Sequence, residues 1–232
     1  MTFDPHKFFN HGAPVTETPY EKNTREQFEA LGRFVQAFEE MVFAARLCCL
    51  ELLAFGLSQQ QRRLVAIPLY YNNLGAKAVF DIFRAVFIET ISDENYRTTH
   101  SLAEAEIQKF SSVLSKINRH YDDLSNRRND LLHGTWIMGA ASAEDPDGSK
   151  FRVHRLRVSG TGLSEVALPT TATELLALRD QCQEVRRWIW TIFGCLPFMA
   201  GTLMPGNSFN ECFECRGGQW RRVWPLPGSD WW

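Results

Sequence analysis

Apolar side chains recur at alternating intervals of three and four residues along three long segments of this chain. That spacing places them on one face of an α-helix, and such a face is expected to pack against other helices. The three stripes consist of Phe28, Leu31, Val35, Phe38, Val42, Ala45, Cys49 and Leu52; of Phe110, Leu114, Ile117, Tyr121, Leu124, Arg128 and Leu131; and of Leu175, Leu178, Cys182, Val185, Ile189, Ile192 and Leu196. A chain with three such helices is expected to fold as a helical bundle.

Turn and capping signals set the expected ends of the helices. Four helices are expected, at about residues 24–55, 74–91, 101–133 and 172–196. Ser101 is expected to cap the third helix, and Thr171 with Glu174 has the spacing of a capping box before the fourth. Pro68 is expected to interrupt any helix between residues 57 and 73, because proline lacks the backbone N–H that a helix interior uses.

A β-hairpin is expected between the third and fourth helices. Apolar and polar side chains alternate in residues 151–158, and residues 165–168 are expected to pair with them across a turn at 159–162. The predicted fold class is therefore all-α: an antiparallel four-helix bundle with a small β-hairpin inserted before the last helix.

The chain is expected to comprise three parts. Residues 1–22 form an N-terminal arm, residues 23–200 the helical bundle, and residues 201–232 a C-terminal extension rich in tryptophan and arginine. Such an extension can stack on the bases of a nucleic acid. It can equally pack on the bundle or on a partner, and packing is the favoured interpretation.

Composition excludes several classes of protein. Of the 232 residues, 44% are hydrophobic and 22% are charged, which is typical of a globular protein rather than a disordered one. The formal net charge of -2 gives no overall basic field for coating nucleic acid, although it is compatible with a local basic site. From the absence of a long apolar run and of a basic stretch before an apolar core, we expect neither a membrane span nor a secretory leader. Four of the six cysteines lie in expected helices, where free thiols act as small apolar side chains, so the cysteines indicate a reduced protein. We therefore expect a cytoplasmic protein without membrane contact.

Three polar residues stand where the third helix is expected to end. Arg128 falls on the apolar stripe, where a lone charge is costly unless it has a partner. Asn129 and His133 are four residues apart and share a helix face. A structural interpretation pairs Arg128 with Glu39 or Glu40 of a neighbouring helix and lets His133 end its own helix. A chemical interpretation uses the histidine for proton transfer and the arginine to hold a phosphate.

The pattern Arg-Asn-x-x-x-His-Gly at this position resembles the motif of the HEPN superfamily, and the continuation Gly134-Thr135-Trp136 resembles a bacterial branch of that family. The resemblance covers about residues 24–197. It implies a metal-independent endoribonuclease that needs no cofactor, acts on RNA, and works as a homodimer with a composite active site. It also implies a toxin or defence setting, with an antitoxin or another defence-system protein as a partner.

The resemblance assigns a role to each residue of the motif. Arg128 would hold the phosphate and stabilise the charge of the transition state, and His133 would transfer the proton of the attacking 2′-hydroxyl. Asn129 would orient His133 or contact the phosphate. Arg127 lies off the stripe, so it is expected either to contact RNA or to remain a solvated charge.

Other interpretations remain open at this stage. A HEPN-like module without activity would bind nucleic acid or a protein partner, and an all-helical regulator would use its Trp-rich tail as its working surface. Cys212 and Cys215 supply only two of the four ligands that zinc needs, and His6 and His11 could complete such a site only by long-range placement. We therefore expect no metal site.

Overall fold

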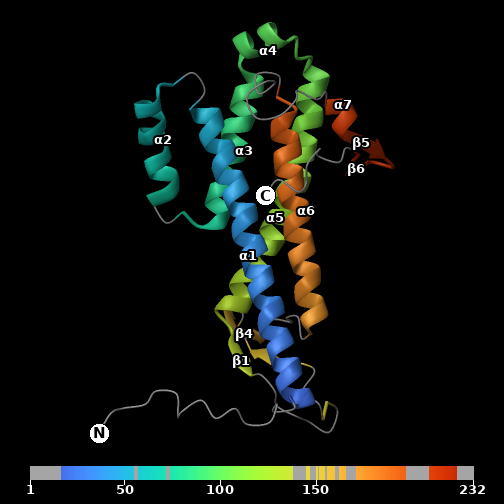
Figure 1. Cartoon of the computed structure of the whole chain (residues 1–232). Helices are drawn as coiled ribbons and strands as arrows, with labels where there is room; N and C mark the ends of the chain where they lie inside the picture. The colour runs from blue at the N-terminus through green and yellow to red at the C-terminus, as the bar shows by residue number, and fades with distance from the viewer. Residues whose placement is uncertain are drawn as a thin grey trace, which may run out of the picture.

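The structure is a computed structural model that describes residues 17–54, 57–71, 74–137, 145–146, 150, 152–154, 156–159, 162–165, 171–196 and 209–223. These residues are mostly helical (Figure 1). The helices are α1 (Pro19–Leu53), α2 (Gln59–Tyr71), α3 (Ala76–Ser92), α4 (Glu94–His100), α5 (Glu104–Leu132), α6 (Ala172–Gly194) and α7 (Phe209–Cys212). None of the described helices has the length and apolar character that crossing a membrane requires.

The four long helices α1, α3, α5 and α6 pack along one another. α1 contacts α6 and α3, and α5 contacts the same two helices from the other side. α5 runs antiparallel to α3 and α6, whereas α1 points the same way as both, because α2 returns the chain before α3 begins (Figure 1). The prediction of antiparallel neighbours is therefore right for α5 with α3 and α6, but wrong for α1 with α3 and α6. α2 is an additional helix that packs on the outside of α1.

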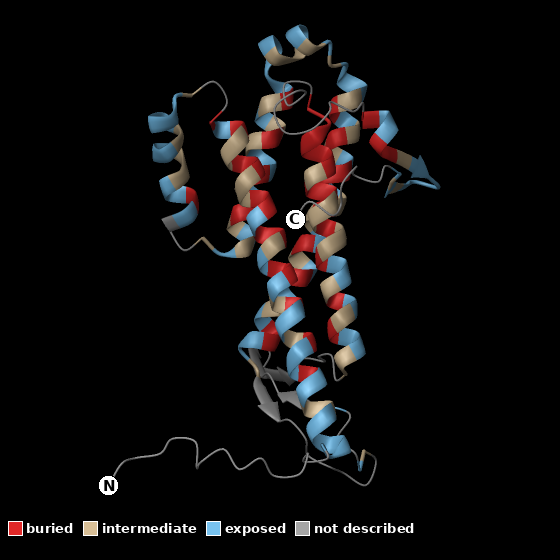
Figure 2. Cartoon of the chain, viewed as in Figure 1, coloured by how far each residue is buried: buried red, intermediate tan, exposed pale blue. Residues whose placement is uncertain are grey.

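The core lies where these four helices run together, as the buried residues in Figure 2 show. Its centre is aromatic: Phe80 of α3 stacks on Tyr121 of α5 with ring centroids 4.6 Å apart, and Phe87 meets Phe110 at 5.7 Å. Every apolar residue of the stripes predicted on α5 and α6 is buried, which confirms both helical faces.

The stripe predicted on α1 is wrong at its start. Phe28 is 55% exposed, and the buried face of the first turns instead carries Gln27, Ala30 and Phe34. The difference has a geometric cause: a strict three-four alternation drifts by about 20° per heptad around a straight helix. Along the 35 residues of α1 that drift moves Phe28 off the face that Phe38 shares with the core.

Two expected helix boundaries are also wrong. α1 begins at Pro19, inside the segment expected to be an arm, because Thr18 and Glu21 form a capping box around a proline at the first helical position. α2 continues through Pro68, which removes one hydrogen bond without ending the helix. The next residue, Leu69, is buried in the core, and this packing helps to hold the last turn.

Ser101 has a different role from the predicted one. It adopts the left-handed conformation, with φ 53°, and ends α4 instead of capping α5. α5 begins after Ala103, whose backbone N–H donates to the carboxylate of Glu106 at 3.1 Å. The capping box predicted before α6 is confirmed, since Thr171 accepts from the backbone of Glu174 and the Glu174 carboxylate accepts in return.

Short antiparallel strand pairs complete the described fold. β1 (Thr135–Ile137) pairs with β2 (Arg152–His154), β3 (Leu156–Ser159) with β4 (Gly162–Glu165), and β5 (Phe213–Arg216) with β6 (Gln219–Arg222). A hairpin lies before α6 as predicted, but it consists of β3 and β4 alone, because residues 152–154, expected in its first strand, pair with β1 instead. Its second strand, β4, begins at Gly162 instead of Glu165, and Gly162 pairs with Ser159. Residues 166–168 lie outside the described residues.

The described part of the C-terminal extension packs on α5 and α6. Phe209 contacts the ring of Phe110 at 4.7 Å, and the indole Nε1 of Trp220 donates to Ser112 Oγ at 2.9 Å. The β5–β6 turn consists of Gly217 and Gly218, both with positive φ, which suits a tight hairpin. Packing is thus the observed arrangement for this segment, while Trp224, Trp231 and Trp232 lie outside the described residues.

Candidate functional site

The end of α5 carries the three residues that the sequence singled out. Arg128 and Asn129 lie in the last turns, and His133 is the C-cap. The Arg128 side chain is 28% exposed, because the apolar stripe of α5 turns it toward α1. Its Nη2 donates to Glu39 Oε1 at 3.1 Å, and its guanidinium carbon lies 5.6 Å from the ring centroid of Phe38. The structural ion pair considered for Arg128 is therefore present.

Arg128 retains hydrogen-bonding capacity beyond that pair. A guanidinium has five N–H donors. Nη1 of Arg128 lies 3.5 Å from Asn129 Oδ1, a long contact, and Nε is buried without a hydrogen-bond partner among the described residues. The Glu39 side chain is 53% exposed, so water weakens its hold on the arginine. Glu40, the other candidate partner, accepts a hydrogen bond from Arg186 of α6.

A pocket of about 400 Å³ opens beside Arg128, between α1, the start of α3 and α5. Its walls bring together polar residues that are far apart in the sequence. The cations are Arg46, Lys77 and Arg128, the carboxylates Glu39 and Asp122, and the amides Asn126 and Asn129. Glu39 pairs with Arg128 and Asp122 with Lys77, so three cations against two carboxylates leave a small net positive charge, and an anion such as a phosphate would bind by replacing a carboxylate.

Two of these cations were not found from the sequence. Arg46 Nη2 donates to the carbonyl of Leu74 at 3.1 Å and thereby joins α1 to the start of α3, while its buried Nε has no hydrogen-bond partner among the described residues. Lys77 is 69% exposed and lies 3.8 Å from Asp122. Neither belongs to a motif, and only the packing of α3 between α1 and α5 brings them to Arg128.

A buried tyrosine lies close to the charged groups of the pocket. Tyr121 is fully buried, and burial raises the pKa of its hydroxyl far above the ordinary value, although the charge of Arg46 opposes that rise. The carboxylates Glu39 and Asp122 act in the same direction as burial. The phenol therefore stays neutral and serves the core through its stacking on Phe80.

His133 lies outside the pocket. Its side chain is exposed, and its backbone N–H donates to the carbonyl of Asn129 at 3.0 Å, which closes the last turn of α5. Within the described part of the chain, no hydrogen bond or ion pair joins His133 to Arg128. The structure thus places Arg128 and Asn129 on one pocket wall and leaves His133 accessible just beyond it.

Arg127 and Asp130 flank the motif on other faces of α5. Arg127 is 43% exposed, lies 3.9 Å from Asp123 on its own helix, and does not line the pocket. Asp130, which sequence reasoning did not single out, is a buried acidic residue in the last turn. No signal in the sequence separates it from the neighbouring polar residues, because its burial depends on tertiary packing.

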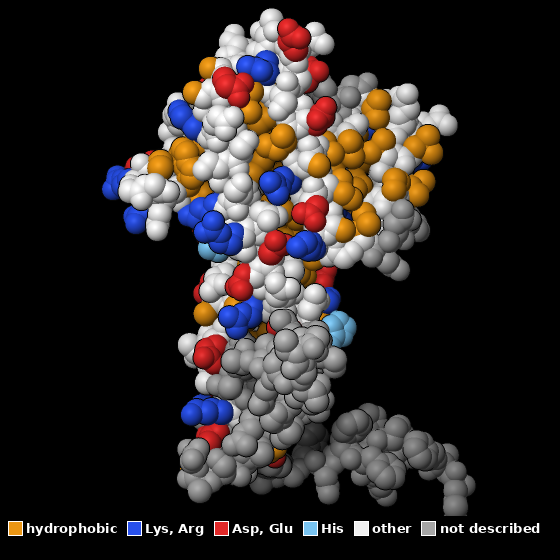
Figure 3. All heavy atoms as spheres, turned by 180° about the vertical axis from the view of Figure 1, so that it is seen from behind, with side chains coloured by type: hydrophobic (Ala, Val, Ile, Leu, Met, Phe, Trp, Pro, Cys, Tyr) orange, Lys and Arg blue, Asp and Glu red, His pale blue; other side chains and the backbone are white. Residues whose placement is uncertain are grey.

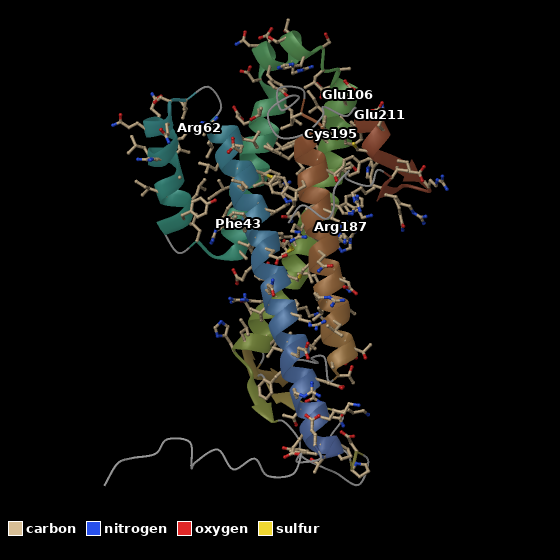
Figure 4. All side chains as sticks on the ribbon, in the orientation of Figure 1. Phe43, Arg62, Glu106, Arg187, Cys195 and Glu211 are labelled. Carbon is tan, nitrogen blue, oxygen red and sulfur yellow. The ribbon has the colours of Figure 1, made fainter. Side chains whose placement is uncertain are left out.

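The cysteines of the C-terminal extension do not converge on one site. Cys212 is buried and Cys215 is exposed, so the CxxC pair divides between the core and solvent. The hydrogen bond between the thiols of Cys212 and Cys195 raises the pKa of Cys195 and lowers that of Cys212. Figure 4 shows Cys195 at the end of α6, near Glu106 and Glu211. In the described residues, no three His, Cys, Asp or Glu side chains cluster as metal ligands.

Comparisons of this chain with protein-family models, with curated proteins and with solved structures find no match.

Proposed function

We propose that this protein is a metal-independent endoribonuclease of the HEPN type. In this proposal α1, α3, α5 and α6 correspond to the four-helix bundle of that family, and α2 is an addition to it. The observation that carries the proposal is the placement of Arg128 and Asn129 on the wall of a cationic pocket, with the accessible His133 one turn beyond at the end of the same helix.

The residues at the end of α5 match the chemistry of RNA cleavage. RNA carries its own nucleophile, the 2′-hydroxyl, and attack on the adjacent phosphorus requires that hydroxyl to lose a proton. His133 takes this proton or gives one to the leaving oxygen. Arg128 exchanges Glu39 for the phosphate and stabilises the charge that develops in the transition state. Asn129 contacts the phosphate, while Arg46 and Lys77 raise the positive potential of the pocket.

A homodimer would complete this site. No hydrogen bond or ion pair joins His133 to Arg128 within the described part of one chain, so a twofold axis near the end of α5 would add a second histidine and arginine to one groove. The partner surface would then include Arg127, Asn129 and the region of Trp136. Sedimentation in dilute buffer is expected to show a dimer. A strictly monomeric protein that still cleaves RNA would exclude the composite groove.

The ion pair between Arg128 and Glu39 favours a second candidate function, a HEPN-like module that binds nucleic acid or a protein partner without cleaving. In that case the arginine holds α5 against α1, and the pocket is a binding surface only. The two functions differ in one respect: only the enzyme loses an RNA-cleaving activity when His133 is replaced.

The purified protein is expected to cleave RNA in the presence of a chelator and to leave 2′,3′-cyclic phosphate ends. The reason is that the proposed step uses a histidine, an arginine and the 2′-hydroxyl of the substrate. End-group analysis of products from a mixed RNA pool, with and without the chelator, measures this. Intact RNA in the chelator, with cleavage restored by magnesium, would contradict the mechanism.

A further inference from the structure

A second cationic surface lies on the outer face of α5, separate from the pocket. Lys109, Lys116, Arg119 and Arg127 follow one another at intervals that keep them on one side of the helix. None of them lines the pocket. At about 1.5 Å of rise per residue, the distance along α5 from the first to the last is roughly 27 Å. We call these four residues, together with Arg221 of β6, the α5 track.

The C-terminal hairpin covers one end of this track and extends it. The ammonium of Lys109 donates to Asn210 Oδ1 at 3.0 Å, and that of Lys116 donates to the carbonyl of Trp220. The Lys116 ammonium also lies 4.5 Å from the ring centroid of Trp188 on α6. These contacts explain Lys109 as an anchor of α7 and Lys116 as an anchor of the hairpin. They also bring the next residue of β6, Arg221, to the side of α5.

Two of the other cations of the track, Arg119 and Arg221, have no such structural role. Arg119 and Arg221 are exposed, and neither forms a hydrogen bond or ion pair with the described residues. Burial lowers the pKa of Lys116, and the charge of Arg221 lowers it further while that of Glu184 opposes the shift, so the two cations lie close enough to repel each other. The pKa of His120, on the same part of α5, is lowered by burial and then by the charges of Lys116 and Arg119.

The carboxylates around the track are mostly occupied. Glu184 of α6 is shared by Arg187 at 3.2 Å and Arg222 at 3.6 Å. On the hairpin, Glu214 pairs with Arg216 at 2.5 Å. Asp123 lies 3.9 Å from Arg127 and is the acidic residue on this face of α5. The surface therefore remains positive in a chain whose net charge is -2.

We propose that the α5 track binds the phosphodiester backbone of single-stranded RNA and leads the strand toward the end of α5. The inference rests on the proposed ribonuclease function for its direction, since the track ends at Arg127, beside Arg128. Single strands are held by a positive surface that follows the backbone, with aromatic rings on which bases stack, and the half-buried Trp220 is the ring at this surface. Backbone contacts of this kind carry little sequence preference and weaken with salt.

The test measures binding without cleavage. The His133→Ala protein is titrated into a fluorescent oligouridine, alone and with the added changes Arg119→Gln and Arg221→Gln. The matched control carries Arg63→Gln and Arg84→Gln, which remove the same charge from exposed positions on α2 and α3. We expect the track variant to bind on the order of tenfold more weakly and to lose about 1.4 from the slope of log affinity against log salt, at about 0.7 per phosphate contact. The control is expected to stay near the parent.

Equal weakening in the track variant and the control would overturn the track, because it would show only a response to net charge. Unchanged RNA binding in the track variant would overturn it as well. So would binding to phosphatidylserine vesicles that depends on Arg119 and Arg221 while RNA binding does not. The proposed ribonuclease function fails independently: a wild-type protein that binds oligouridine through the track but leaves it intact refutes cleavage and keeps the track.

Discussion

Replacement of His133 by alanine is expected to reduce RNA cleavage by about 10²- to 10⁴-fold, the usual cost of losing a positioned acid-base group. The loss should come without unfolding. His133 is exposed, and the hydrogen bond that closes α5 uses its backbone N–H, which alanine retains. Cleavage rate under single-turnover conditions and the thermal unfolding midpoint measure the two effects separately.

The matched control is His100→Ala. His100 is also at the end of a helix, α4, and its ring contacts Tyr96 with centroids 4.5 Å apart. It lies at the opposite end of α5 from His133, so we expect this variant to cleave RNA as the parent does (Figure 1). If His133→Ala cleaves at nearly the parental rate while folded, His133 is not the acid-base group.

Replacement of Arg128 by alanine is expected to have two effects. Cleavage should fall by a factor on the order of 10²–10³, the loss seen when one donor to a developing oxyanion is removed. Stability should fall by about 1 kcal/mol, because the partly exposed pair with Glu39 is lost together with the packing of the guanidinium on Phe38. Chemical denaturation and single-turnover cleavage are the measurements.

Glu39→Gln separates these two effects of Arg128. It weakens the same ion pair but leaves the guanidinium in the pocket, so we expect a small loss of stability with cleavage retained or increased. Arg128→Lys keeps the charge without the two-pronged donor geometry and should not restore the parental rate. A reversed pattern, with cleavage lost in Glu39→Gln and retained in folded Arg128→Ala, would assign Arg128 to structure alone.

Much of the fold follows from local sequence signals. The apolar stripes of α5 and α6, the capping box of Thr171 and the presence of a hairpin before α6 are all confirmed. Each depends on spacing within a few residues of the chain. The errors have different origins. The capping box of Thr18 is a local signal that begins α1 before its expected start, whereas Pro68 is accommodated inside α2, where Leu69 is buried by tertiary packing.

The helix α2 has a face that the sequence could not place. Leu64, Ile67 and Tyr70 are exposed by 64%, 50% and 38%, in contrast to the buried Leu69 of the same helix. Seen from behind, hydrophobic side chains gather on the side of the molecule where α2 lies (Figure 3). The sequence did not predict α2, because its first turn is polar, it contains Pro68, and its apolar residues do not form a single core-facing stripe.

Only the residues of the candidate site that lie on α5 could be predicted from the sequence. The spacing on α5 places Arg128 on the buried face and Asn129 with His133 on another face. It predicts an ion pair of Arg128 with Glu39 or Glu40, of which the structure has the first. Arg46 and Lys77 were missed, because they reach the pocket from α1 and α3 through tertiary packing. The α5 track likewise could not be predicted, because Arg221 comes from a hairpin that is separated from α5 by the whole of α6.

The most direct test of the proposed reaction is a single RNA oligonucleotide in which the nucleotide before the cut site carries a 2′-deoxy sugar. The substrate is incubated with the parent protein in chelator beside the all-ribose oligonucleotide. We expect the all-ribose strand to be cut to a 2′,3′-cyclic phosphate and the substituted strand to remain intact at that position, because the 2′-hydroxyl is the nucleophile. Cleavage of the substituted strand at the same bond would contradict the proposed mechanism.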